Sequence, residues 1–73
     1  SRADDTILSE ARLLVEMEPQ RYKAWWEIAR IQMARKEYPE ALLALEQYLR
    51  RTPQRDVQAE QLWRMLDNRM RQR

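Results

Sequence analysis

The sequence contains few side chains of the types that usually perform catalysis. Its 73 residues include no histidine, cysteine or glycine. This removes the commonest general base, the thiolate and imidazole metal ligands, and the glycine-rich loops that bind phosphate. The remaining candidates are hydroxyls without a partner base and carboxylates spread along the chain, mostly beside arginine or lysine. They are Ser1, Thr6, Ser9, Thr52, Glu10, Glu27, Glu37, Glu40, Glu46 and Glu60. We therefore expect no catalytic activity, metal, cofactor or small-molecule substrate. A cysteine-free chain suits the cytoplasm and the periplasm equally, so the compartment stays open.

Arginine is concentrated in the last third of the chain. Residues 50–73 contain seven arginines and three acidic residues, whereas residues 1–49 contain seven basic and nine acidic residues. A basic helix can bind nucleic-acid phosphates or an anionic membrane surface, and we keep both as alternative functions. No nucleic-acid-binding motif accompanies the arginines. No apolar run approaches the roughly 20 residues of a membrane span. We therefore rank both alternatives below a protein partner.

Prolines divide the chain into four segments that are rich in helix-forming residues. Pro19, Pro39 and Pro53 separate stretches at about 4–17, 22–35, 39–51 and 55–71. Each stretch has apolar residues at helical spacing. The connections are short, so consecutive helices must run antiparallel. The sequence predicts an all-α fold of four helices, arranged as antiparallel helix-turn-helix units.

The chain repeats itself at a spacing of 34 residues. The tripeptide Pro-Gln-Arg occurs at 19–21 and again at 53–55. The same offset pairs Leu8 with Leu42, Leu14 with Tyr48, Val15 with Leu49, Ile28 with Leu62, Arg30 with Arg64, and Arg35 with Arg69. A period of about 34 residues built from two helices is the period of the tetratricopeptide repeat.

Residues 22–55 resemble one complete tetratricopeptide repeat. The matching positions are Trp25-x-x-Ile28-Ala29, then Tyr38-Pro39-Glu40-Ala41, then Leu45, Tyr48 and Pro53. The resemblance implies that residues 1–19 hold the second helix of a preceding repeat, residues 22–53 a full repeat, and residues 55–71 a C-terminal capping helix. It also implies that the chain is the C-terminal part of a larger, bacterial-type scaffold or assembly protein that binds other proteins.

The sequence departs from the family pattern at two positions, and the partial repeat at its start lacks a first helix of its own. Gln32 replaces the usual aromatic residue of the first helix, and Lys36 replaces the usual glycine of the inter-helix turn. A left-handed backbone at Lys36 would cost on the order of 1 kcal/mol relative to glycine. Trp63 falls at the register of the small residue Ala29, and we expect it to fold over the end of the core.

The adjacent tryptophans Trp25 and Trp26 must face different directions, because a helix turns by about 100° per residue. Trp25 matches the structural tryptophan of the repeat, so we expect it between the helices. Trp26 shares a stripe with Lys23, Arg30 and Met33 at spacings of three and four, and we expect it to offer a contact surface. The alternative is that Trp26 is covered, with Arg30 stacked over its ring.

The family resemblance places the Trp26 stripe on the wall of a concave groove lined by the first helices of successive repeats. The expected partner-binding groove consists of Lys23, Trp26, Arg30, Met33, Val57, Glu60 and Arg64. We expect it to bind an acidic or amphipathic protein segment, with Glu60 partly neutralising Arg64. The stripe contains no asparagine, so we do not expect the carboxylate clamp of chaperone-binding family members.

Self-association is an alternative function. Leu13 and Met17 lie off the main apolar stripe of the first helix. The helix that would cover them in a complete repeat is not among these residues, so either a preceding segment or a second copy would do so. We therefore expect the isolated chain to form a homodimer through Leu13 and Met17.

Overall fold

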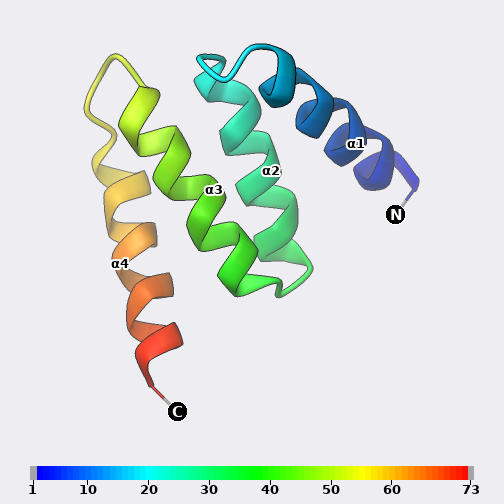
Figure 1. Ribbon diagram of the computed structural model, residues 1–73. Coiled ribbons are helices and arrows are strands. Elements are labelled where there is room, and N and C mark those ends of the chain that lie inside the picture. The colour runs from blue at the N-terminus through cyan, green and yellow to red at the C-terminus, as the bar shows by residue number, and fades with distance from the viewer. Residues whose placement is uncertain (1, 73) are drawn as a thin grey trace.

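A computed structural model describes residues 2–72 as four helices joined by short connections (Figure 1). They are α1 (Arg2–Met17), α2 (Tyr22–Ala34), α3 (Tyr38–Arg51) and α4 (Val57–Arg71). The all-α prediction is confirmed, and no strand occurs within residues 2–72. The helix boundaries differ from the expected ones by one or two residues. The start of α4 differs because Asp56 is its N-cap, with a side-chain oxygen accepting the N–H of Ala59 at 3.0 Å.

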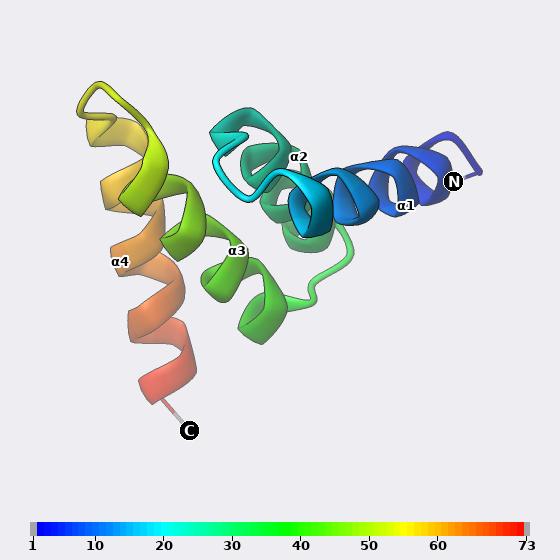
Figure 2. The same cartoon turned by 45° about the horizontal axis from the view of Figure 1, so that its top comes forward.

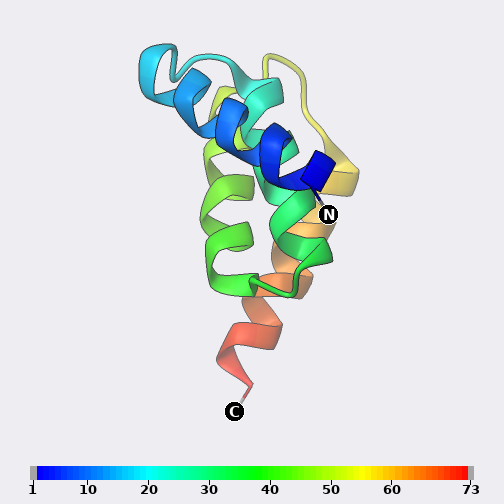
Figure 3. The same ribbon diagram turned by 90° about the vertical axis from the view of Figure 1, so that its right-hand side faces the viewer.

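The helices follow one another as an open array. Within residues 2–72, every helix-to-helix contact joins neighbours in sequence: α1 with α2, α2 with α3, and α3 with α4. Figures 1 and 2 show α1 and α4 on opposite sides of the central α2–α3 pair. Figure 3 shows α1 crossing that pair obliquely. Consequently, α1 and α4 each have only one packed neighbour among the described helices.

Small residues allow the helices to approach closely. Ala29 of α2, Ala41 of α3 and Ala59 of α4 are all fully buried. Ile31 and Leu45 are the largest fully buried side chains of the described residues. The buried residues therefore form a thin layer along the helix array and do not surround a single central point.

The turn between α2 and α3 has the geometry that glycine usually provides. Lys36 has a φ of 61°, which is the left-handed region. The N–H of Lys36 donates to the carbonyl of Met33 at 3.0 Å, and the N–H of Glu37 donates to that of Gln32 at 2.8 Å. This is the Schellman pattern of bonds at a helix end. Lys36 therefore carries the backbone cost anticipated from the sequence.

The last helix, α4, buries only part of the face that the 34-residue offset predicts. The offset aligns Met65 with Ile31, yet Met65 is 66% exposed and Ile31 only 1%. Leu66, which the offset aligns with the buried Gln32, is buried together with Ala59, and Trp63 packs half-buried against the core as expected. The cause is that α2 lies between two helices, whereas α4 contacts only α3, so no described helix covers Met65.

Candidate protein-binding surface

Three aromatic rings meet where α2 and α3 pack together. Tyr22 and Trp26 lie four residues apart on α2, so they share one face of the helix. Their ring centroids lie 6.1 and 5.3 Å from that of Tyr48 on α3, in both cases at a tilt of 46°. Tilted pairs at these distances are favourable arrangements for aromatic side chains. We call these three residues the aromatic cluster.

The aromatic cluster is tied to the first turn of α4 through Asp56. The Tyr48 hydroxyl donates to Oδ2 of Asp56 at 2.6 Å, while Oδ1 of Asp56 accepts the N–H of Ala59. The hydrogen bond from Tyr48, aided by that from Ala59, lowers the pKa of Asp56. The same hydrogen bond, aided by burial, raises the pKa of Tyr48. At neutral pH the pair is therefore a phenol hydrogen-bonded to a carboxylate.

A cleft of about 500 Å³ opens beside the aromatic cluster, between the N-terminal ends of α2 and α4. Its walls include Tyr22, Tyr48 and Val57, and the α3–α4 connection completes it. The side chain of Val57 is exposed. The cleft thus combines two aromatic side chains, an exposed aliphatic one and the residues of the α3–α4 connection.

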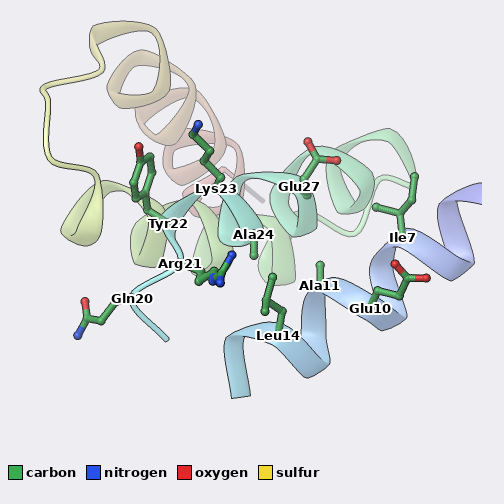
Figure 4. Close-up of a pocket in the computed structure, with 10 residues that line it drawn as sticks. All are labelled: Ile7, Glu10, Ala11, Leu14, Gln20, Arg21, Tyr22, Lys23, Ala24 and Glu27. Carbon is green, nitrogen blue, oxygen red and sulfur yellow. The ribbon is translucent and has the colours of Figure 1, made fainter. Parts of the chain in front are cut away.

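Two exposed cations of α2 and α4, Lys23 and Arg64, are not among the residues that line the cleft and are unpaired within the described chain. Within residues 2–72, no acidic side chain forms an ion pair with Lys23 or Arg64, and both are exposed. Lys23 follows Tyr22 directly, and Figure 4 shows the two side chains extending from the same side of α2. Arg64 lies seven residues after Val57, two turns along the same face of α4. Neither charge is neutralised by the fold.

The remaining charged residues of the expected groove are engaged within the chain. Arg30 pairs with Glu27 at 2.8 Å, which raises the pKa of Arg30. Glu60 pairs with Arg55 at 3.2 Å, so the expectation that it neutralises Arg64 is wrong. These exposed pairs contribute little to stability.

The expectation that Trp26 lies outside the helix-to-helix contact is also wrong. Its ring is half-buried against the core and contacts Tyr48 of α3. The alternative of Arg30 stacked over Trp26 does not occur either. The guanidinium groups over aromatic rings in the described chain are those of Arg51, over Trp25 at 5.6 Å, and Arg69, over Tyr38 at 4.6 Å.

Trp25 lies at the junction of α1, α2 and α3. Its Nε1 donates to the carbonyl of Pro19 at 2.9 Å, and its ring is half-buried against the core. Arg51 of α3 covers the ring. Both tryptophans thus contact α3, but Trp25 also fixes the α1–α2 connection.

The predicted groove residues do not line one cavity. Val57 lies in the cleft beside the aromatic cluster, whereas Lys23 lines a different cavity between α1 and α2. Met33 is half-buried against the core. Tyr22 and Tyr48 were missed as site residues, although their spacing from Trp26 and Asp56 was visible in the sequence. The residues predicted for self-association, Leu13 and Met17, are 60% and 79% exposed.

The described residues hold neither a metal-binding cluster nor a membrane-spanning helix. Among residues 2–72, no group of three or more acidic side chains is placed to hold a metal ion. None of the four described helices combines the length and apolar character needed to cross a membrane. Comparisons with protein-family models, curated proteins and solved structures gave no match.

Proposed function

We propose that this chain is a tetratricopeptide-like module that binds a segment of a partner protein at the cleft beside the aromatic cluster. The observation that carries the proposal is the position of the aromatic cluster. It lies beside the cleft between α2 and α4, which are one repeat period apart in the sequence. Tyrosine, tryptophan and arginine are the residues most enriched at the energetic centres of protein interfaces. The 34-residue period and the Trp25 to Pro53 pattern support the family assignment.

The charges support an acidic or amphipathic partner segment. Lys23 and Arg64 have no ion-pair partner in the described chain, so an acidic ligand would not have to displace one. Three of the six arginines in residues 50–72 form ion pairs: Arg50 with Glu46, Arg55 with Glu60, and Arg71 with Asp67. Two more, Arg51 and Arg69, lie over aromatic rings. A phosphate backbone needs a continuous row of available cations. This distribution therefore favours a protein partner over nucleic acid.

Selection from a random peptide library, followed by calorimetric titration of the selected peptides, tests the proposal. The expected peptides contain acidic and aromatic residues and bind more weakly at high salt. Val57→Glu alters an exposed residue of the cleft, and Arg64→Glu alters an exposed residue two turns further along α4. Each is expected to weaken binding by about tenfold. Arg12→Glu makes the same charge change as Arg64→Glu at an exposed site on α1, so it should leave the affinity unchanged. Selected peptides whose affinity is unchanged by both Val57→Glu and Arg64→Glu would contradict the proposal.

A further inference from the structure

A further cavity lies in the groove between α1 and α3, with α2 as its floor. Its volume is about 470 Å³. The groove exists because α1 and α3 both pack on α2 rather than on each other, and Figure 1 shows α2 between them. Each helix contributes residues at helical spacing, which on α2 are Trp25, Ile28 and Gln32. None of the lining residues belongs to the cleft beside the aromatic cluster.

The base of this cavity is apolar except for one amide. Val15, Ile28 and Ala44 come from three different helices, and each is at most 7% exposed. Gln32 of α2 lies among them and is only 4% exposed. Its Oε1 is buried and has no hydrogen-bond partner among residues 2–72. The cavity therefore contains an acceptor that the described chain does not use.

A glutamine is unexpected at this position, because the equivalent position of α4 is apolar. The 34-residue offset aligns Gln32 with Leu66, which is 6% exposed. Burying an amide oxygen without a hydrogen bond is unfavourable, and a leucine avoids that cost. No hydrogen bond within residues 2–72 holds the Gln32 amide, so rotation about its Cγ–Cδ bond brings the oxygen to the cavity. A donor that enters the cavity would thus satisfy this group.

Two carboxylates belong to the wall of the cavity. Glu16 of α1 and Glu40 of α3 are exposed, and neither forms an ion pair within residues 2–72. Glu40 lies at the same end as Gln32, because the carbonyl of Gln32 accepts the N–H of Glu37, three residues before Glu40. The wall also holds one exposed cation, Arg12 of α1. Its carboxylates therefore outnumber its cations.

The other end of the cavity shows how the chain holds a guanidinium group. Arg51 of α3 donates to the carbonyl of Gln47 at 3.3 Å and also to Oε1 of Gln47. It lies over the ring of Trp25, 5.6 Å from the ring centroid. Gln47 and Trp25 both line the cavity, seven residues along their helices from Glu40 and Gln32. One end thus already holds an arginine of the chain, whereas the other offers acceptors without one.

We propose that the end of this cavity near Gln32 and Glu40 binds an arginine side chain of a partner protein. The aliphatic stem lies on Ile28 and Ala44, as the stems of long basic side chains do on apolar surfaces. The guanidinium donates to Oε1 of Gln32 and pairs with Glu40. Arginine suits two separate acceptors better than lysine, because its planar head carries donors on several nitrogens. Leu43, which is 63% exposed at the edge of the cavity, contacts an apolar residue beside the arginine.

The test titrates the isotope-labelled 73-residue chain with the peptide acetyl-Leu-Arg-Leu-amide and follows it by NMR. Saturable shifts are expected at Ile28, Leu43 and Ala44 and at the side-chain amide of Gln32. The same peptide with citrulline in place of arginine keeps the shape and loses the charge, so it should bind about tenfold more weakly. The lysine peptide should lie between the two.

Variants of the charged and polar residues test the sign of the interaction. Glu40→Gln and Gln32→Leu are each expected to weaken binding of the arginine peptide by about tenfold. Gln32→Leu introduces the residue found at the equivalent position of α4, so melting curves should show a retained fold. Arg12→Gln removes the cation of the wall and should strengthen binding. Glu10→Gln makes the same charge change as Glu40→Gln at an exposed residue outside this cavity and should have no effect.

The small cation n-butylguanidinium separates a protein ligand from a free one. It has the head and stem of arginine without the flanking leucines, so it should bind more weakly than the peptide. Leu43→Gln should weaken binding of the peptide and leave that of n-butylguanidinium unchanged. Leu13→Gln is the matched control, because Leu13 is similarly exposed, at 60%, and does not line the cavity.

Four results would overturn the inference: no saturable shift, equal affinities of the arginine and citrulline peptides, stronger binding to Glu40→Gln than to the unmodified chain, or equal affinities of n-butylguanidinium and the peptide. The third would make the ligand an anion, and the fourth a small guanidinium compound. Val57→Glu and Arg64→Glu should not affect this site, so this inference and the proposed function can fail separately.

Discussion

The phenol of Tyr48 and the carboxylate of Asp56 join α3 to α4 through a hydrogen bond of 2.6 Å. The same carboxylate caps α4 by accepting the N–H of Ala59. The Asp56 side chain therefore caps the start of α4 and also positions the Tyr48 ring, which Tyr22 and Trp26 contact. Both the stability of the array and the shape of the adjacent cleft depend on this pair.

Replacing Tyr48 by phenylalanine should destabilise the chain by about 1–2 kcal/mol, because it leaves a half-buried carboxylate with one hydrogen bond fewer. Chemical denaturation followed by circular dichroism measures the difference. Tyr38→Phe is the matched control, since it removes a hydroxyl from the same helix and keeps the ring beside Arg69. Equal stability of Tyr48→Phe and the unmodified chain would show that the hydrogen bond is not formed in solution.

The stability contributed by this pair should depend on pH in a defined direction. Asp56 has a lowered pKa in the folded chain, so its contribution is fully present above the ordinary carboxyl pKa and is lost as the pH falls through the folded value. Tyr48 has a raised pKa, so its contribution persists below the ordinary phenol pKa and is lost as the pH rises through the folded value. The stability difference between the unmodified chain and Tyr48→Phe should therefore be constant near neutral pH and shrink at both extremes. A difference that grows in acid would contradict the assignment.

Lys36→Gly should stabilise the chain by up to about 1 kcal/mol, because glycine adopts a φ of 61° without the steric cost that lysine carries. Thermal melting is a sufficient measurement. Ala34→Gly, two residues earlier within α2, should destabilise by a similar amount. A destabilising effect of Lys36→Gly would mean that the turn is not left-handed at this position.

The two tryptophans should differ in the cost of their removal. Trp25→Ala loses a hydrogen bond to Pro19 and the contact with Arg51, and should cost about 3–5 kcal/mol, comparable with the whole stability of a small domain. Trp26→Ala loses the contact with Tyr48 and should cost less, about 1–3 kcal/mol. Trp26→Phe keeps an aromatic contact, so its stability should be the closest of the three to that of the unmodified chain. Melting curves of the three variants decide the order, and a larger loss for Trp26→Ala than for Trp25→Ala would reverse it.

The helices and the repeat could be read from the sequence because prolines, apolar spacing and the 34-residue offset are local or periodic signals. The left-handed backbone of Lys36 could be anticipated from the alignment with the repeat pattern, which usually has glycine at this position. The exposure of Met65 on α4 could not be predicted from the offset, since it depends on α4 having one neighbouring helix where α2 has two. The ion pairs could not be predicted from the sequence either. Arg55 and Arg64 lie at comparable sequence distances from Glu60, and only the three-dimensional path of the α3–α4 connection selects Arg55 as its partner. Gln32 was noted as a departure, but its burial with an unpartnered Oε1 depends on packing.

The most direct test of the proposed function is an NMR titration of the labelled chain with a peptide selected from the random library. Binding at the cleft predicts saturable shifts at Tyr22, Lys23, Tyr48, Val57 and Arg64, and at the indole N–H of Trp26. The same titration of the Arg64→Glu variant should need about tenfold more peptide to reach saturation. Two results together would contradict the claim that this cleft binds a partner protein: no shift of the NMR signals of the aromatic cluster and Val57, and an unchanged affinity of the Arg64→Glu variant.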